Sequence, residues 1–263
     1  MKNIKKIIIG LTWLTINIPS LANQHTTIAE DCTQKITLPA GYTIANTDED
    51  CDFGENMIPV SYHNKVGYAN QAGKIVIKPT FAEAHGFDEG LALIKKDDKY
   101  GFINPKGKII IKPTFDDAWS FSEGRAKITQ NGKYGFIDKT GKIVIAPTLT
   151  EADNWFAQNL VAVKKGDKWG FIGPDGRTKI AFEYDYASGF SEGLALVAKK
   201  NSPTSDIYHF GFIDKYGNVV IPLNYDNATS FIDGTATVTK DNQIFYINKQ
   251  GKRLTTPQHT RFL

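Results

Sequence analysis

The sequence predicts an all-β fold in which tandem three-stranded β-meander repeats form an open, twisted β-array. Two observations predict it. A glycine–aromatic step recurs every 34 to 41 residues, and runs rich in Ile, Val, Phe and Tyr surround each step. A period of this length is typical of stacked units that are each too small to bury a core alone. The steps are Gly67-Tyr68, Gly101-Phe102, Gly135-Phe136, Gly170-Phe171, Gly211-Phe212 and a last copy without the glycine, Phe245-Tyr246.

Each step opens a predicted β-hairpin. In the copy at 134–147, two apolar runs flank the turn Asp138-Lys-Thr-Gly141. Asp or Asn at the start of such a turn can bond the backbone ahead, and Gly at its end tolerates a positive φ. Pro79, Pro113 and Pro147 fall at the end of the second run, where a missing N–H limits further pairing.

A third strand precedes each hairpin, as in 125–128. Its second residue is Ala or Val and its fourth is Ile or Val in every copy, while the first and third residues vary. Alternate residues of a strand share a face. We therefore expect one tightly packed face and one freer, wetter face. Between units runs a linking loop such as 115–124, whose aromatic residues recur in register and are expected to fill the gap between neighbours.

Together these residues resemble the bacterial tryptophan-glycine (WG) repeat family. The resemblance covers roughly residues 58–256 and rests on Tyr134-Gly-Phe-Ile-Asp138, Gly141-Lys-Ile-Val-Ile-Ala-Pro147, Phe115-Asp-Asp-Ala118 and Phe121-Ser-Glu-Gly124. Only Trp169-Gly170 carries the literal dipeptide. The resemblance implies an all-β repeat protein, of a kind often exported. It implies no catalytic residue.

The alternative architecture is a closed five- or six-bladed β-propeller. Thirty-four residues with three strands are short for a propeller blade, which usually has four strands. The first unit begins with its first strand and the last ends with its third, so no blade is split between the termini. These points favour the open array.

The N-terminal segment predicts export. Lys2, Lys5 and Lys6 precede an uncharged, mostly apolar run, and Ser20-Leu-Ala22 offers small residues for cleavage between Ala22 and Asn23. Residues 1–22 are therefore expected to be a signal peptide, with no membrane insertion after cleavage and a periplasmic or secreted product. Residues 23–57 are expected to form an N-terminal cap held by a Cys32–Cys51 disulfide, and 257–263 a C-terminal tail.

Charge excludes one class of partner. The three lysines of the predicted signal peptide account for the whole formal excess of +3. A neutral mature chain has no general attraction for nucleic acid.

No motif for catalysis, phosphate binding or dinucleotide binding occurs, and the five histidines lack ligand spacing. We therefore expect no catalytic residue, no metal and no cofactor. A row of acids, Glu89, Glu123, Glu192 and Asp233, precedes Gly in four linking loops. It could bind cations or basic ligands, but the favoured interpretation is that each acid accepts hydrogen bonds from its own turn.

Departures from the repeat indicate where a partner could bind. Trp119 and Trp155 stand in successive linking loops, and Trp155 comes with a one-residue insertion. They suit stacking on sugars or partner side chains, although extra core packing is the stronger alternative. A seven-residue insertion, 201–207, adds Asp206 and adjoins Tyr208 and His209. The sequence thus favours an exported, non-enzymatic module that binds a protein or glycan. The alternative is a secreted hydrolase or carbohydrate-active enzyme with a site around Asp206, His209 and the Trp155 loop.

Overall fold

The computed structural model describes residues 36–45 and 54–255. The predicted signal peptide with its cleavage site at Ala22 and Asn23, the residues Cys32 and Cys51, and the tail 257–263 lie outside the described residues.

The described chain consists almost entirely of strands, with one 3-10 turn, η1 (Gly54–Asn56). The first half contains β1 (Thr43–Ile44), β2 (Met57–Tyr62), β3 (Lys65–Asn70), β4 (Ile75–Phe81), β5 (Glu83–Asp88), β6 (Leu91–Lys96), β7 (Lys99–Ile103), β8 (Ile109–Phe115), β9 (Asp117–Ala118), β10 (Arg125–Gln130), β11 (Lys133–Asp138) and β12 (Ile143–Leu149). The second half contains β13 (Val161–Lys165), β14 (Lys168–Ile172), β15 (Thr178–Tyr184), β16 (Tyr186–Ser191), β17 (Leu194–Lys200), β18 (Tyr208–Ile213), β19 (Val219–Tyr225), β20 (Asn227–Ala228), β21 (Thr235–Lys240), β22 (Gln243–Asn248) and β23 (Arg253–Leu254).

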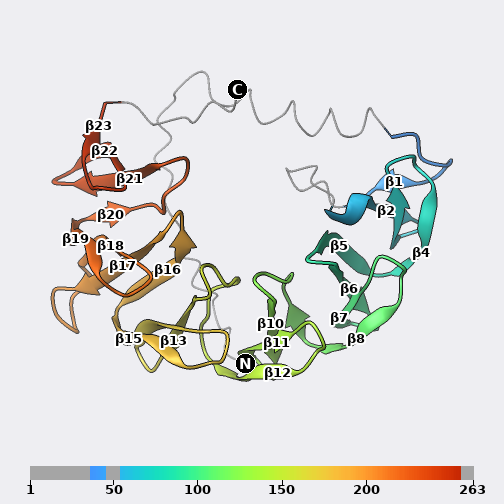
Figure 1. Cartoon of the computed structure of the whole chain (residues 1–263), viewed down its shortest axis with the longest axis horizontal. Coiled ribbons are helices and arrows are strands. Elements are labelled where there is room, and N and C mark those ends of the chain that lie inside the picture. The colour runs from blue at the N-terminus through green and yellow to red at the C-terminus, as the bar shows by residue number, and fades with distance from the viewer. Residues whose placement is uncertain (1–35, 46–53, 256–263) are drawn as a thin grey trace, which may run out of the picture.

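These strands form six antiparallel meanders, called units one to six below. They are β1–β4, β5–β8, β9–β12, β13–β15, β16–β19 and β20–β23. Figure 1 shows the units following one another around an open arc, with β1 and β23 at its opposite ends. The all-β repeat array predicted from the sequence is confirmed.

The linking loops differ from the expectation, because most of them add a fourth strand to their unit. Residues 83–88 form β5, which pairs with β6 through Ala84↔Ile94 and Phe87↔Ala92. In the fourth unit, where a one-residue insertion accompanies Trp155, the loop forms no continuous strand and pairs through two isolated bridges, Ala152↔Val163 and Ala157↔Leu160. The added strand lies at the inner side of the arc, as β5 and β16 show in Figure 1, while β8 and β19 lie outside.

Neighbouring units pack face to face. Leu91, Leu93 and Phe102 of the second unit form one core with Phe121, Ala126 and Ile128 of the third. The expectation of a wetter face is therefore wrong, because Leu93 and its counterpart Leu196 are each only 4% exposed. A strand pattern shows which residues share a face but not whether a second sheet covers it.

An aromatic pair marks every junction, as the recurring aromatics predicted. The ring centroids lie 4.7 to 5.2 Å apart. The pairs are Tyr68–Phe87, Phe102–Phe121, Phe136–Phe156, Phe171–Phe190 and Phe212–Phe231. Such a pair contributes about 0.5–1.5 kcal/mol beyond the burial of its area.

The glycine of each step allows two strands to approach closely. A Cβ at Gly135 would lie 2.6 Å from the carbonyl oxygen of Ile145 and 2.8 Å from Cα of Pro147. The register between β11 and β12 shifts at the same place. Because backbone atoms cannot give way as a flexible side chain can, the first five units require glycine here. The sixth unit has Phe245 at this position, and its last strand spans only Arg253–Leu254.

Candidate functional site

The inner strands carry the residues in which the units differ most. Between the recurring Ala and Phe of the linking segment, each unit has its own polar, small or aromatic residues. They are His85-Gly86, Trp119-Ser120, Asp153-Asn-Trp155, Ser188-Gly189 and Thr229-Ser230. A repeated frame thus presents a variable inner side, which is typical of repeat proteins that bind partners.

A buried lysine links the third and fourth units at this inner side. Lys127, on β10, is 3% exposed, at the strand position where other units have Leu93 or Leu196. Its Nζ donates hydrogen bonds to Oδ1 of Asn154 and, at 3.4 Å, to the carbonyl oxygen of Ala152. It lies 3.7 Å from the centre of the Trp119 ring and 4.8 Å from that of Tyr134. Two oxygens and two aromatic faces therefore replace the water around the ammonium group.

Burial lowers the pKa of Lys127 to about 8, and the nearby carboxylates of Asp153 and Asp117 oppose that shift. An ammonium loses hydration in such a site, which favours its neutral form. The group still carries its charge at neutral pH, where Trp119 and Tyr134 can stabilise it.

The two tryptophans singled out from the sequence have different environments. Trp119 is half-buried and packs over Lys127 and against Tyr134, at 6.1 Å between ring centroids. Trp155 is 50% exposed. The two residues before Trp155 are anchored to neighbouring units: Asn154 accepts a hydrogen bond from Lys127 of the third unit, and Asp153 accepts one from Gly189 N of the fifth. Trp119 therefore has a packing role, whereas Trp155 offers an aromatic surface on an anchored segment.

The structure does not join Asp206, Tyr208 and His209 to these tryptophans. They belong to the fifth unit, at the turn between β17 and β18. His209 Nε2 lies 2.6 Å from Oδ1 of Asn201, and Lys200 packs over the Tyr208 ring. Asp206 is exposed and makes no hydrogen bond or ion pair with any described residue. Its carboxylate does not orient the His209 imidazole, as an acid–base pair would require.

Sequence reasoning missed Lys127, Asp153 and Asn154. One signal was available, because Lys127 is the only lysine at the third position of the strand that precedes each hairpin. A lysine in an alternating strand resembles a solvent-facing residue, so its burial becomes evident only when the fourth unit covers it.

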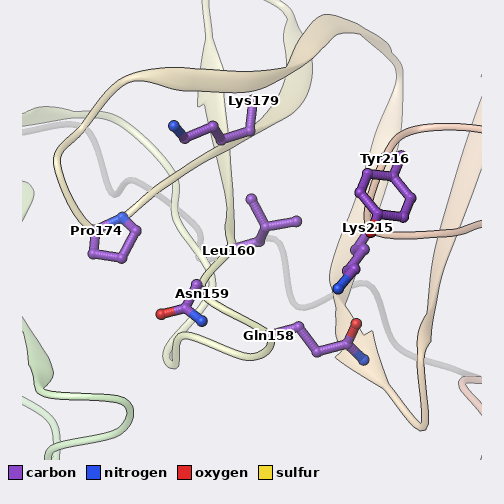
Figure 2. Close-up of a pocket in the computed structure, with 7 residues that line it drawn as sticks. All are labelled: Gln158, Asn159, Leu160, Pro174, Lys179, Lys215 and Tyr216. Carbon is purple, nitrogen blue, oxygen red and sulfur yellow. The ribbon is translucent and has the colours of Figure 1, made fainter.

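A pocket opens at one end of the strands of the fourth and fifth units, where their turns meet (Figure 2). Its volume is about 480 Å³. It is lined by Gln158, Asn159, Leu160, Pro174, Lys179, Lys215 and Tyr216. Turns after the first and third strands of an antiparallel meander share one end of the sheet, so the 201–207 turn lies at the opposite end.

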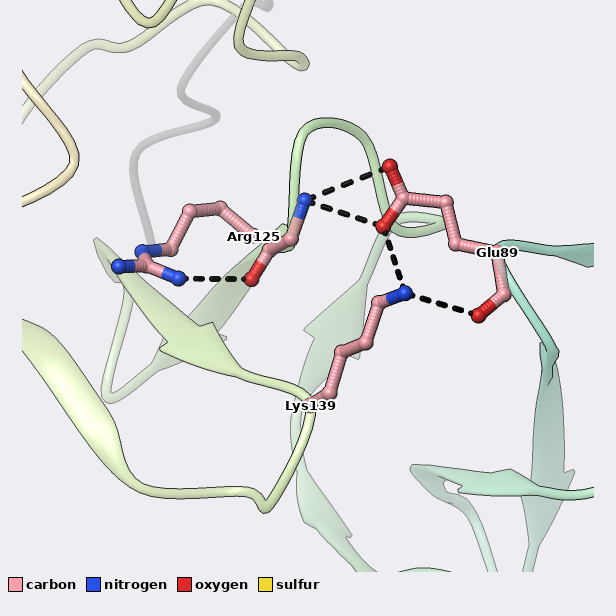
Figure 3. A network of polar contacts seen from close by, with 4 residues as sticks. Glu89, Arg125 and Lys139 are labelled. Atoms are coloured by element: carbon pink, nitrogen blue, oxygen red, sulfur yellow. Dashed lines mark hydrogen bonds and ion pairs between the residues drawn. The ribbon is translucent and has the colours of Figure 1, made fainter.

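The equivalent junction of the second and third units is closed by a glutamate (Figure 3). The Glu89 carboxylate accepts hydrogen bonds from Gly124 N at 3.0 and 3.3 Å and pairs with Lys139 Nζ at 3.1 Å. Lys139 also donates to the carbonyl oxygen of Glu89 at 2.9 Å, and Arg125 donates to that of Gly124 at 2.9 Å. We call a glutamate bonded to the turn of the next unit a carboxylate clamp.

Two further junctions carry a clamp. Glu192 accepts from Gly234 N at 3.0 and 3.2 Å and pairs with Lys249 at 3.4 Å. Glu123 accepts from the backbone N–H groups of Gln158 at 2.8 Å and Asn159 at 2.6 Å. The expectation that these acids bond their own turns is therefore wrong. Each carboxylate reaches the next unit, a tertiary contact that a local turn motif does not reveal.

Across residues 36–45 and 54–255, no group of three or more His, Cys, Asp or Glu side chains is placed to hold a metal ion. No helix in the same part of the chain is long and apolar enough to cross a membrane.

Comparison with known proteins identifies the repeat. The family model described as "WG containing repeat" matches five successive stretches, 67–100, 100–134, 134–169, 169–201 and 210–243. No curated protein sequence matches the chain. The matched stretches have the period of the glycine–aromatic steps and cover more than half of the chain.

Several solved structures are similar at low identity. "Crystal structure of the eukaryotic initiation factor" shares 10% identity, covers 72% of this chain and 59% of its own, and has a TM-score of 0.47. Hsv2 of "Kluyvelomyces marxianus" shares 12%, with 73% and 75% covered and a TM-score of 0.43. The uncharacterized protein lmo1340 from Listeria monocytogenes EGD-e shares 13%, with 63% and 61% covered and a TM-score of 0.40. This chain spans less than two thirds of the length of the first.

Proposed function

The chain belongs to the WG containing repeat family, and on that premise we propose that it is an exported, non-enzymatic module that binds a protein or glycan partner in the cell envelope. Its place would be the periplasm or the exterior of the cell, with residues 1–22 removed as a signal peptide. The balanced charge of the remaining chain supports a partner other than nucleic acid.

The observation that carries this proposal is the exposure of Trp155. An indole that is 50% exposed in an anchored segment offers a large apolar face with few torsions to immobilise. The bonds from Lys127 to Asn154 and from Gly189 to Asp153 hold the two residues that precede Trp155. A partner that stacks on Trp155 would therefore meet a preorganised surface on the inner side of the arc.

The test compares Trp155→Ala with Ile232→Ala, a control whose side chain is 71% exposed in the sixth unit. The chain is immobilised and exposed to a glycan panel and to envelope extract. Saturable binding that is lost in Trp155→Ala and kept in Ile232→Ala supports the proposal. Equal binding by both variants would show that Trp155 does not contact the partner and would contradict the proposed binding surface on the inner side of the arc.

A turnover assay addresses the enzymatic alternative. The purified chain is expected to hydrolyse none of a panel of glycans and peptides. Hydrolysis that disappears on Asp206→Asn or His209→Ala would overturn the non-enzymatic proposal.

A further inference from the structure

The pocket between the fourth and fifth units has the lysine of a carboxylate clamp but not its carboxylate. We propose that it binds the side-chain carboxylate of a glutamate on a polypeptide partner, in the position that Glu89 and Glu192 occupy at their own junctions. The inference rests on the proposed binding function and adds a second surface, with a defined chemistry, at the end of the strands where the turns of the fourth and fifth units meet.

The argument begins with the equivalence of three lysines. Lys139, Lys215 and Lys249 each follow the first Asp or Asn of a hairpin turn. Lys139 and Lys249 pair with the glutamate of the preceding unit, at 3.1 and 3.4 Å. For Lys215 the corresponding residue of the preceding unit is Gln158, which cannot neutralise an ammonium group.

Lys215 is therefore a cation without an acid in the described part of the chain. Figure 2 shows its side chain extending toward Gln158. Gln158 still reaches the junction, since its Nε2 lies 3.9 Å from the place that a Cβ on Gly193 would take. Gly193 corresponds to Gly124 and Gly234, whose N–H groups donate to the clamp carboxylates. A carboxylate from outside would thus find the same two kinds of partner, an ammonium group and a glycine N–H.

A second lysine contributes less. Lys179 lines the pocket but extends toward the Pro174 turn in Figure 2. It also lies near Asp175, whose pKa is lowered first by the hydrogen bond from Arg177 N and further by the charge of Lys179. Because the carboxylate of Asp175 already offsets part of the positive charge of Lys179, we assign the main role to Lys215.

The fifth unit alone places an aromatic residue beside this lysine. Tyr216 is 74% exposed, and Lys215 Nζ lies 5.1 Å from the centre of its ring. The clamped units have Thr140 and Gln250 at the same turn position. An exposed ring next to an unpaired cation suits the methylene groups of a glutamate or the backbone around it. A cavity of about 480 Å³ leaves room for that side chain.

The test titrates the full chain with a capped Gly-Glu-Gly peptide and follows the NMR signals of Gly193, Lys215 and Tyr216. The capped Gly-Gln-Gly peptide, galacturonate and inorganic phosphate serve as comparison probes. We expect saturable shifts with the glutamate peptide and binding weaker by at least about tenfold with the glutamine peptide, because only a charged acceptor gains fully from the ammonium.

Variants locate the site. Lys215→Gln is expected to weaken binding of the glutamate peptide by at least about tenfold, whereas Lys106→Gln, with the same charge change on the second unit's turn, leaves it unchanged. Gln158→Glu is expected to abolish binding while it raises the melting temperature, because the chain then supplies its own carboxylate. That pair of effects excludes misfolding as the cause.

Equal binding of both peptides, or full binding by Gln158→Glu, would overturn the proposal. Stronger binding of galacturonate or phosphate than of the glutamate peptide would overturn the assignment to a polypeptide. A negative titration with the glutamate peptide would not affect binding of a partner through Trp155. Loss of partner binding in Trp155→Ala would likewise leave the titration unchanged, so each proposal can fail without the other.

Discussion

Two junctions, between the second and third units and between the fourth and fifth, have the same core. They differ at the rim, which is the set of turns that meet at one end of the strands. The Phe102–Phe121 and Phe171–Phe190 ring centroids lie 4.8 and 5.1 Å apart. At the rim, Glu89 closes the first junction, whereas Gln158 leaves Lys215 and a pocket open at the second. The repeated apolar residues thus stack the units in the same way at both junctions. The junctions differ in the rim residue, because Glu89 supplies a carboxylate to Lys139 whereas Gln158 supplies none to Lys215.

The largest expected effect tests whether the frame is the same at both junctions. Gly101→Ala and Gly211→Ala would each place a Cβ 2.6 Å from a backbone oxygen of the adjacent strand. Both are expected to lower the free energy of unfolding by about 3 kcal/mol or more, since backbone must move. Chemical denaturation measures the loss. Gly86→Ala is the control, because a Cβ there meets no atom within 4 Å. A large loss in only one of the two glycine variants would mean that the two junctions have different frames.

At the junction of the third and fourth units, a buried lysine replaces an apolar residue of the repeat and makes stability depend on pH. The pKa of Lys127 is about 8 in the folded chain against an ordinary 10.5, so the unfolded chain binds the proton more tightly. The free energy of unfolding therefore contains a penalty below pH 8 that is relieved as the pH rises toward 10.5. Relative to that of Lys127→Met, the free energy of unfolding of the natural chain is expected to rise by on the order of 2 kcal/mol between pH 7 and pH 9.5.

Denaturation at several pH values measures that gain. Lys106→Met, at an exposed position, should leave the pH dependence of the natural chain unchanged. Parallel pH profiles for the natural chain and Lys127→Met would show that the ammonium group is hydrated rather than held by Trp119 and Asn154.

Exchanging the two rim residues tests the comparison directly. Glu89→Gln is expected to lower the free energy of unfolding by about 1 kcal/mol, because the amide keeps one acceptor but loses the charge that Gly124 N and Lys139 meet. Gln158→Glu is expected to raise it by about 0.5–1 kcal/mol. High salt should reduce both changes. If Gln158→Glu is destabilising, Lys215 and Gly193 do not form a vacant clamp.

The sequence predicted the repeated frame because its elements either are local or recur in register. The Gly135-Phe136 step and the hairpin turns are set by residues close in the chain, and the recurring aromatics indicated the contacts between units; all three were predicted correctly. Turn chemistry also holds, since Asp138 Oδ1 accepts from the N–H groups of Thr140 at 2.9 Å and Lys142 at 3.1 Å. The inner strands β5, β9, β16 and β20 mix polar and small residues with the recurring Ala and vary from two to six residues, so their own pattern did not predict their pairing.

Tertiary contacts account for what the sequence did not reveal. The partner of Glu89 is Gly124, in the next unit, and the cover over Lys127 comes from the fourth unit. Both depend on how units stack, which no single repeat encodes. An alignment of the repeats does identify the residues that depart from the pattern. Gln158 stands where other units have glutamate, and Lys127 stands where other units have Leu, Ala or Thr.

The smallest expected effect concerns the 201–207 insertion, at the end of the fifth unit opposite the pocket. Its first four residues are exposed, and the side chain of Asn201 forms a hydrogen bond with His209 of β18. Replacing 201–207 by the Asn-Gly turn of the third unit (131–132) should change the free energy of unfolding by less than about 0.5 kcal/mol, because β17 and β18 keep their register. The glutamate peptide should bind the shortened chain as before, since the pocket lies at the other end of the strands. If the shortened chain folds but no longer binds the peptide, the insertion at one end of the fifth unit affects the pocket at the other end. Peptide binding could then not be explained by Gln158 and Lys215 alone.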